Sequence, residues 1–152
     1  MTKTRVLAGL AVALAVAVPA SLAAALHQPK RSGVRGQITV RSTENLKATD
    51  VTNGGVAGRG GFRISGAITD KGKVTDYRTV KGGTALIRRV AVGARGTITF
   101  LITIHLGDST PAPWKITSAT RAYKDLHGKG RQVVDNFSET PATFVLKGTV
   151  SR

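Results

Sequence analysis

The stretch Val92–Gly107, VGARGTITFLITIHLG, decides the fold of this chain. From Thr97 onward, large apolar residues occupy every second position, and the positions between them are mostly threonine. Successive side chains of a β-strand point to opposite faces of the sheet, so this period of two predicts a long strand with one face in a core. We expect the following residues to form that inner face: Ile98, Phe100, Ile102, Ile104 and Leu106.

Similar alternating stretches lie on both sides of this strand, and glycine-containing turns such as Asn53-Gly54-Gly55 separate them. No helical pattern comes between them, which predicts an antiparallel meander. A meander of long strands must close into a barrel or fold as two sheets, and the many glycines favour the closed form. The sequence therefore predicts an all-β fold with one eight-stranded antiparallel β-barrel. The expected strands are 36–48, 62–68, 74–80, 84–92, 97–106, 114–118, 132–137 and 142–150.

Trp114, Ile116, Phe144 and Leu146 are expected to meet the inner face of the central strand. Strands close in sequence pair in a meander, and the last strand must close the sheet.

Residues 1–25 have the composition of an export signal. Lys3 and Arg5 precede an apolar run, Val6–Val18, and Ala23–Ala25 offers a cleavage site of small residues. The run is shorter than the roughly 20 residues that a membrane-spanning helix needs, so we expect cleavage rather than a retained anchor. This predicts a secreted or cell-surface protein without a transmembrane anchor in its mature form. A flexible basic linker, 26–35, would then lead into a barrel domain, 36–152.

The chain carries 23 Lys and Arg residues, 8 Asp and Glu residues and no Cys, for a net charge of +15. An exported fold without disulfides must hold itself together by packing. So large a positive charge attracts anionic polymers without sequence preference. Aromatic residues make up only 5% of the chain and do not combine with basic residues in a nucleic-acid-binding motif. We therefore expect an anionic cell-surface polymer as a candidate partner and no specific nucleic acid.

The run Trp114–Gly130, WKITSATRAYKDLHGKG, followed by Leu146–Val150, resembles secreted bacterial proteins of the allene oxide cyclase barrel-like group, which is related to the plant dirigent proteins. The pattern of that group is roughly W-x-I-x-S-G-T-G-A-Y-x-x-L-x-G-x-G, and the similarity extends loosely upstream through 61–66 and 96–100. The resemblance implies an eight-stranded antiparallel barrel. Ala119 and Arg121 replace two glycines of the pattern, so this turn is expected to follow a different backbone course. The plant cyclases use acidic and cysteine groups that have no counterpart here, so the fold is carried over and the catalysis is not.

Asp76 lies inside a predicted strand, on the same face as Val74 and Val80, and would point into the barrel beside Arg78. A buried carboxylate needs a partner, so we expect an internal Asp-Arg pair, with an acid-base role as the alternative. The candidate ligand-binding residues of the barrel cavity are Asp76, Arg78, Phe100, Ile102, Trp114 and Tyr123.

No residues can be assigned a catalytic, metal-binding or cofactor-binding role from the sequence. It has no nucleophile elbow, its three His residues are scattered, and its carboxylates do not cluster with them. Three functions remain as hypotheses. The first is a barrel that binds a small hydrophobic ligand or serves as a structural module. The others are a cell-surface protein that binds polyanions and an isomerase resembling the cyclases.

We predict that the exported protein begins near Leu26, because residues 1–25 have the basic, apolar and small-residue regions of a signal peptide in order. Intact-mass measurement of the protein from culture supernatant tests this. A secreted species that still carries Val6–Val18 would contradict it.

Overall fold

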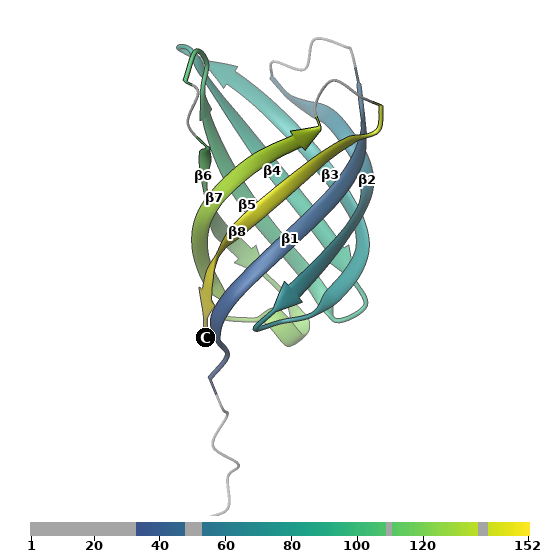
Figure 1. Cartoon of the computed structure of the whole chain (residues 1–152), viewed down its shortest axis with the longest axis vertical. Helices are drawn as coiled ribbons and strands as arrows, with labels where there is room; N and C mark the ends of the chain where they lie inside the picture. Colours follow the sequence, from purple (N-terminus) through teal and green to yellow (C-terminus); the bar gives the residue numbers. More distant parts are fainter. Residues whose placement is uncertain (1–32, 48–52, 109–110, 137–139) are drawn as a thin grey trace, which may run out of the picture. The chain divides into compact units, whose positions relative to one another are not determined.

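Eight strands form a closed antiparallel barrel in the computed structural model, which describes residues 33–47, 53–108, 111–136 and 140–152 (Figure 1). Each strand pairs with its neighbours in sequence, and β8 pairs with β1. The predicted fold class is therefore confirmed. The strands are β1 Arg35–Leu46, β2 Asn53–Gly66, β3 Asp70–Lys81, β4 Thr84–Gly93, β5 Gly96–His105, β6 Ala112–Ala119, β7 His127–Asn136 and β8 Ala142–Ser151.

The chain divides into two units, residues 1–31 and residues 32–152, and the barrel belongs to the second. The expected export signal, 1–25, lies outside the described residues, and so does most of the expected linker, 26–35. Within the described part, β1 begins at Arg35, one residue before the expected start of the barrel domain.

Pairing of the first strand with the last closes the barrel. The β1–β8 ladder is continuous from Arg35 opposite Ser151 to Glu44 opposite Ala142. The β6–β7 ladder is shorter and runs only from Ala112 to Lys115 on β6. Closure gives every strand a neighbour on both sides, and one inward and one outward face.

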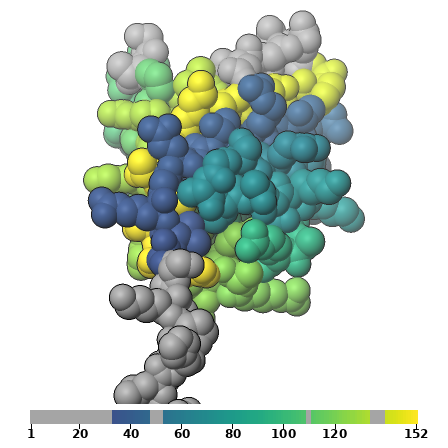
Figure 2. Space-filling model, turned by 60° about the horizontal axis from the view of Figure 1, so that its bottom comes forward, coloured from purple at the N-terminus to yellow at the C-terminus, as the bar shows by residue number. Residues whose placement is uncertain are grey.

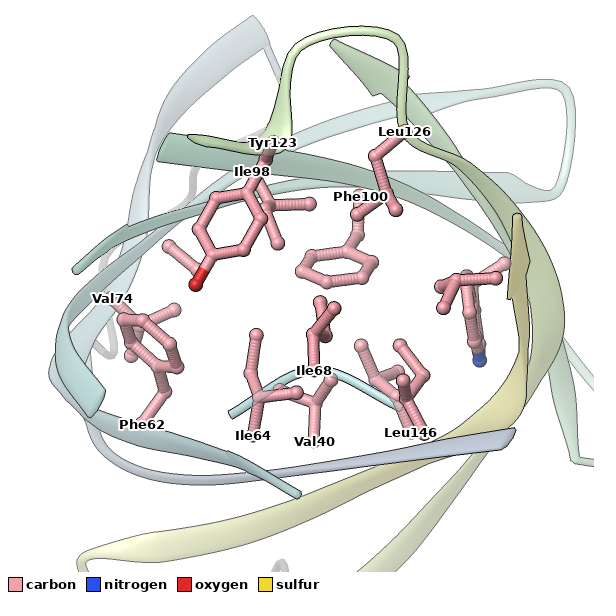
Figure 3. Close-up of a cluster of buried hydrophobic side chains, with 14 of the residues drawn as sticks. Val40, Phe62, Ile64, Ile68, Val74, Ile98, Phe100, Tyr123, Leu126 and Leu146 are labelled. Carbon is pink, nitrogen blue, oxygen red and sulfur yellow. The ribbon is translucent and has the colours of Figure 1, made fainter. Parts of the chain in front are cut away.

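The inner face of β5 forms the centre of the apolar core, as the sequence predicted (Figure 3). Ile98, Phe100 and Ile102 are completely buried, and Ile104 is half-buried. Leu106 is an exception, since it is 60% exposed. β5 ends at His105, so the alternation that points side chains inward stops one residue before Leu106.

Residues of β6, which pairs with β5, and of β8 meet this face. The ring of Trp114 packs edge-to-face against Phe100, with 5.5 Å between the ring centroids, and Leu146 is completely buried. Ile116 packs against the same cluster, as expected. Phe144 is also buried, but it lies against the guanidinium of Arg89, outside this apolar cluster.

One end of the barrel is closed by a short 3₁₀ helix, η1 (Arg121–Tyr123). Tyr123 of η1 and Leu126, three residues further along the chain, point into the core (Figure 3), and both are buried. The Tyr123 hydroxyl donates a hydrogen bond to Asp70 Oδ2 at 2.8 Å. Burial, with Asp70 adding to it, raises the pKa of Tyr123 to about 12. This end comes forward in Figure 2, and no opening is visible in it outside the part that the grey atoms cover.

Arg121, which stands where the resembled pattern has a glycine, adopts a φ of 53°. That left-handed conformation is one that glycine adopts at lower cost than other residues.

The turn expected at Asn53-Gly54-Gly55 is wrong, because β2 already begins at Asn53 and runs to Gly66. The glycines of this strand allow close approach of the neighbouring chain. At Gly60, a Cβ atom would overlap the backbone carbonyl of Thr43 on β1. The glycine-rich stretch is therefore a strand that curves tightly against β1, and the turn signals in it were misleading.

We predict that Phe100→Ala lowers the free energy of unfolding by about 3–5 kcal/mol, because it removes a completely buried ring. Thr99→Ser, on the outer face of the same strand, should change it by less than about 1 kcal/mol. Urea unfolding of both variants measures the difference. Equal midpoints, or a weaker Thr99 variant, would mean that the inner and outer faces of β5 have been exchanged.

Candidate functional site

A cavity of about 730 Å³ lies inside the barrel at the end opposite η1. The last residues of β1, β3 and β5 and the first residues of β4 and β8 contribute to its wall, which places it at the mouth of the barrel. Most of the wall is apolar, and five of its residues carry a charged or amide side chain. The lining residues are Leu46, Lys47, Ala57, Asp76, Arg78, Ala85, Ile87, Arg89, Ile104, Leu106, Gln132, Thr140 and Phe144.

A two-pronged ion pair between Arg89 and Asp76 forms the polar part of this wall. Arg89 Nε donates to Asp76 Oδ1 at 2.9 Å, and Arg89 Nη2 donates to Asp76 Oδ2 at 2.7 Å. The two residues stand directly opposite each other on β4 and β3, so the register of the sheet brings them together. Arg89 is 1% exposed, and its guanidinium also lies 4.9 Å from the centre of the Phe144 ring.

Glu44 reaches the same arginine from β1, which is not a neighbour of β4. Glu44 Oε1 lies 2.8 Å from Arg89 Nη2 and accepts a hydrogen bond from Ser42 Oγ at 2.7 Å. Glycine on the intervening strand provides the space, because a Cβ atom on Gly58 would come within 2.9 Å of Glu44 Oε2. Three strands, β1, β3 and β4, therefore contribute to one buried charge cluster, Glu44–Arg89–Asp76.

One guanidinium faces two carboxylates in this cluster, and burial has the largest effect on the pKa of Glu44. Burial raises the pKa of Glu44 to about 7; the charge of Arg89 lowers it and the charge of Asp76 raises it further. Burial also opposes the charge on Arg89, but attraction and hydrogen bonds from Asp76, with Glu44 adding, raise its pKa overall. Arg89 and Asp76 thus form the ion pair, and Glu44 holds its proton to a higher pH than an exposed carboxyl group does.

Four buried polar atoms at this end of the barrel have no hydrogen-bond partner among the described residues. They are Glu44 Oε2, Arg78 Nε, Arg89 Nη1 and Gln132 Oε1. Buried polar groups are nearly always paired, and leaving one unpaired costs about 1–3 kcal/mol. Arg78, Arg89 and Gln132 all line the cavity. Two hydrogen-bond donors, Arg78 Nε and Arg89 Nη1, and one acceptor, Gln132 Oε1, therefore lie in its wall without a partner among the described residues.

The structure separates the predicted site residues into two groups. Asp76 and Arg78 line the cavity, whereas Phe100, Ile102, Trp114 and Tyr123 belong to the packed apolar core. These last four residues do not line the cavity.

Asp76 does form an internal pair with an arginine, but its partner is Arg89 rather than the predicted Arg78. Residues two apart on one strand lie about 6.6 Å apart along it, whereas directly opposite residues on paired strands are about 5 Å apart. Arg89 is 1% exposed, so its charge lies inside the barrel.

Glu44 and Gln132 were not predicted as site residues, although a signal for them exists in the sequence. Glu44 follows Ile38, Val40 and Ser42 at every second position of β1, and all four are buried. Once Ile38 and Val40 are assigned to the inside, the same alternation places Glu44 inside.

Comparison with known proteins adds nothing to this geometry, since no protein-family model, characterised protein or solved structure matches the chain. Within the described residues, no helix combines the length and apolar character needed to cross a membrane. The same part of the chain contains no group of three His, Cys, Asp or Glu residues placed to hold a metal ion. His105 and His127 are both exposed.

We predict that the protein loses stability as the pH rises from about 4.5 to about 7. In this range Glu44 ionises in the unfolded chain while its raised pKa keeps it largely protonated in the barrel, so the folded state binds more protons. The loss reaches at most about 3 kcal/mol, since each unit of pKa difference corresponds to about 1.4 kcal/mol. Urea unfolding at several pH values should show this fall, and Glu44→Gln should remove it.

Asp108→Asn is the matched control, because it also removes one carboxylate, from an exposed position. It should leave the fall between pH 4.5 and 7 unchanged. If the two variants alter the pH dependence equally, the effect comes from net charge and the buried cluster does not cause it.

Proposed function

We propose that this protein binds a small, mainly apolar molecule with one oxygen-bearing polar end in the cavity at the mouth of its barrel. The observation that carries the proposal is an apolar cavity whose wall also holds unpartnered buried polar atoms. Its volume of about 730 Å³ lies in the range of about 300–1,000 Å³ that is usual for small-molecule sites. Eight-stranded barrels are also of a size to hold one small ligand.

The unpartnered hydrogen-bonding atoms of the cavity wall define the polar end of the ligand. Arg89 Nη1 and Arg78 Nε are donors without acceptors, and Gln132 Oε1 is an acceptor without a donor. A hydroxyl group can donate to the amide oxygen and accept from a guanidinium, and a carbonyl group can accept from both arginines. The positive charge of Arg89 is already matched by Asp76, so a neutral polar group suits this arginine.

The apolar wall defines the rest of the ligand. Ile87 and Ile104 come from β4 and β5, Phe144 comes from β8, and Leu46 and Leu106 stand at the outer rim, where they are 37% and 60% exposed. Exposed leucines at the entrance of an apolar cavity lose contact with water when a ligand covers them, which favours binding.

We also propose that the protein is secreted and related to the allene oxide cyclase barrel-like group. Support comes from the export-signal pattern of residues 1–25 and from the resemblance over Trp114–Gly130. The eight-stranded antiparallel barrel is the fold that this relationship would require.

An isomerase resembling the cyclases is the second candidate, and Glu44 is the observation that favours it. A buried carboxyl group with a pKa of about 7 is suited to general acid-base catalysis at neutral pH. However, Glu44 does not line the cavity, so its carboxyl group does not face a ligand there. Binding without reaction is therefore better supported.

We expect the purified protein to bind the neutral apolar dye Nile red, and Ile87→Trp to weaken that binding at least about tenfold by filling the cavity. An indole in place of the sec-butyl group of Ile87 occupies space that the dye needs. Leu86→Trp is the matched control, because Leu86 is the next residue on β4 and lies on the outer face. Fluorescence titration compares the variants.

A second variant tests the polar end. Gln132→Leu removes the unpartnered amide oxygen and should weaken binding of 1-decanol while leaving binding of decane unchanged. Competition with Nile red measures both. If Leu86→Trp and Ile87→Trp weaken dye binding equally, or if the folded wild-type protein binds no dye, the cavity is not a ligand site.

A further inference from the structure

Seven Lys and Arg side chains form a continuous path over the outer surface of six neighbouring strands. They alternate with the inward residues of these strands, and all seven are exposed. Three of these strands, β7, β8 and β1, face the reader in Figure 1. We call this path the basic band; from β6 to β3 its residues are Lys115, Lys129, Arg131, Lys147, Arg41, Arg63 and Lys71.

The first half of the basic band consists of like-charged residues placed directly opposite one another. Lys115 on β6 stands opposite Lys129 on β7, and Arg131, two residues further along β7, stands opposite Lys147 on β8. Directly opposite side chains lie about 5 Å apart, so each pair repels and destabilises the sheet. Replacing one residue of each pair by a neutral residue would remove this repulsion and stabilise the sheet, which suggests that the charges serve another purpose.

The second half continues across the seam at which the barrel closes. Lys147 is the diagonal neighbour of Arg41, which stands opposite Val145 on β8. Arg63 on β2 then stands opposite Arg41 on one side and opposite Lys71 of β3 on the other. Arg63 therefore has a like charge on both sides, which is the least favourable arrangement in the band.

No described carboxylate stands opposite a residue of the basic band in the sheet. Of the described carboxylates, two are inside the barrel and three are in the turns or strand starts at its ends. The inner pair is Glu44 and Asp76, and the others are Asp70, Asp108 and Asp125. The seven exposed cations of the band therefore add a positive potential to the outer surface of β6 to β3.

Three hollows lie along the basic band, and glycines form part of each. A hollow of about 550 Å³ has Lys115 and Lys129 in its wall, and a second of about 520 Å³ has Lys129 and Arg131. The third, of about 630 Å³, is lined by all three cations of the second half. The glycines in their walls are Gly36 and Gly128 in the first, Gly130 and Gly148 in the second, and Gly61 and Gly72 in the third.

From these features we propose that the basic band binds a flexible linear polymer that carries a phosphate in each repeat unit, such as a polyphosphate or a single-chain phosphodiester. Paired cations beside a hollow can hold a phosphate between them, and the forked guanidinium of arginine matches its oxygens. The site is independent of the barrel cavity, because it uses the outward residues of the strands.

The curvature of the barrel selects a flexible chain over a rigid one. The basic band crosses six of the eight strands of a closed barrel, an arc of roughly 24 Å at about 4.8 Å per strand step. Duplex DNA stays straight over about 50 nm, so it can touch only a small part of this arc. A single chain can follow all of it.

The test measures binding of the complete mature protein to three probes: long-chain inorganic polyphosphate, poly(glycerol phosphate) and single-stranded oligo-dT. At least one should bind with a logarithmic salt slope near −5, since seven phosphate contacts contribute about −0.7 each for a single strand. The probe that binds most tightly identifies the source of the phosphate. Duplex DNA of equal length should bind more weakly than oligo-dT, with a shallower slope.

Two double variants with the same loss of charge decide whether the band is the site. Arg63→Gln with Lys129→Gln removes one cation from each half and should reduce the slope by about 1.4. Lys81→Gln with Lys124→Gln removes two exposed cations outside the band and should leave the slope unchanged. Because Arg63 is repelled from both sides, the band variant should melt at the same or a higher temperature, so weaker binding cannot be attributed to unfolding.

Equal effects of the two double variants would overturn the proposal, since binding would then follow net charge alone. Tighter binding of duplex DNA than of every single chain would also overturn it. So would binding to phosphatidylserine vesicles combined with no binding to any of the three polymers.

Discussion

Closure of the sheet between β1 and β8 is the constraint on which the other features of this protein depend. Once the sheet is closed, every strand must divide its residues between a small interior and a surface that curves away on all sides. The interior is filled by Phe100, Trp114 and their neighbours at the end that η1 covers, and it remains partly open at the other end. The residues that alternate with these inward side chains lie on the outer surface, whatever their charge.

The charge cluster at the open end shows how the interior accommodates polar groups. Arg89 is held by Asp76 from the next strand and by Glu44 from across the barrel, and Gly58 leaves room for that second carboxylate. Buried ion pairs are weak contributors to stability, because desolvation offsets most of their attraction. Apolar side chains of similar size would fill the same space. The cluster is better explained by the cavity beside it, where Arg89 still has a donor without a partner.

On the outer surface, repulsion between like charges lowers the stability of the sheet, although these charges are exposed. Opposed like charges such as Arg41 and Arg63 oppose pairing of the strands that carry them. The alternation of each strand separates the two features completely, so changes in one leave the other intact. The two proposed binding surfaces, the apolar cavity inside the mouth and the basic band around the outside, therefore use opposite faces of the same strands.

The sequence by itself determined the number of strands, their meander and most of the inner face of β5, because a period of two is a local property of a strand. The glycine-rich first part of β2 lacks this alternation, and its sequence predicts a turn instead. The sequence also placed Asp76 inside the barrel by the same alternation. Only the tertiary structure decided which arginine Asp76 meets, since the choice of Arg89 depends on the register between β3 and β4. Glu44 meets Arg89 only because the barrel closes and brings β1 opposite β4. The basic band likewise depends on register across six strands, and a scatter of cations along the chain becomes a continuous path only when those strands are aligned.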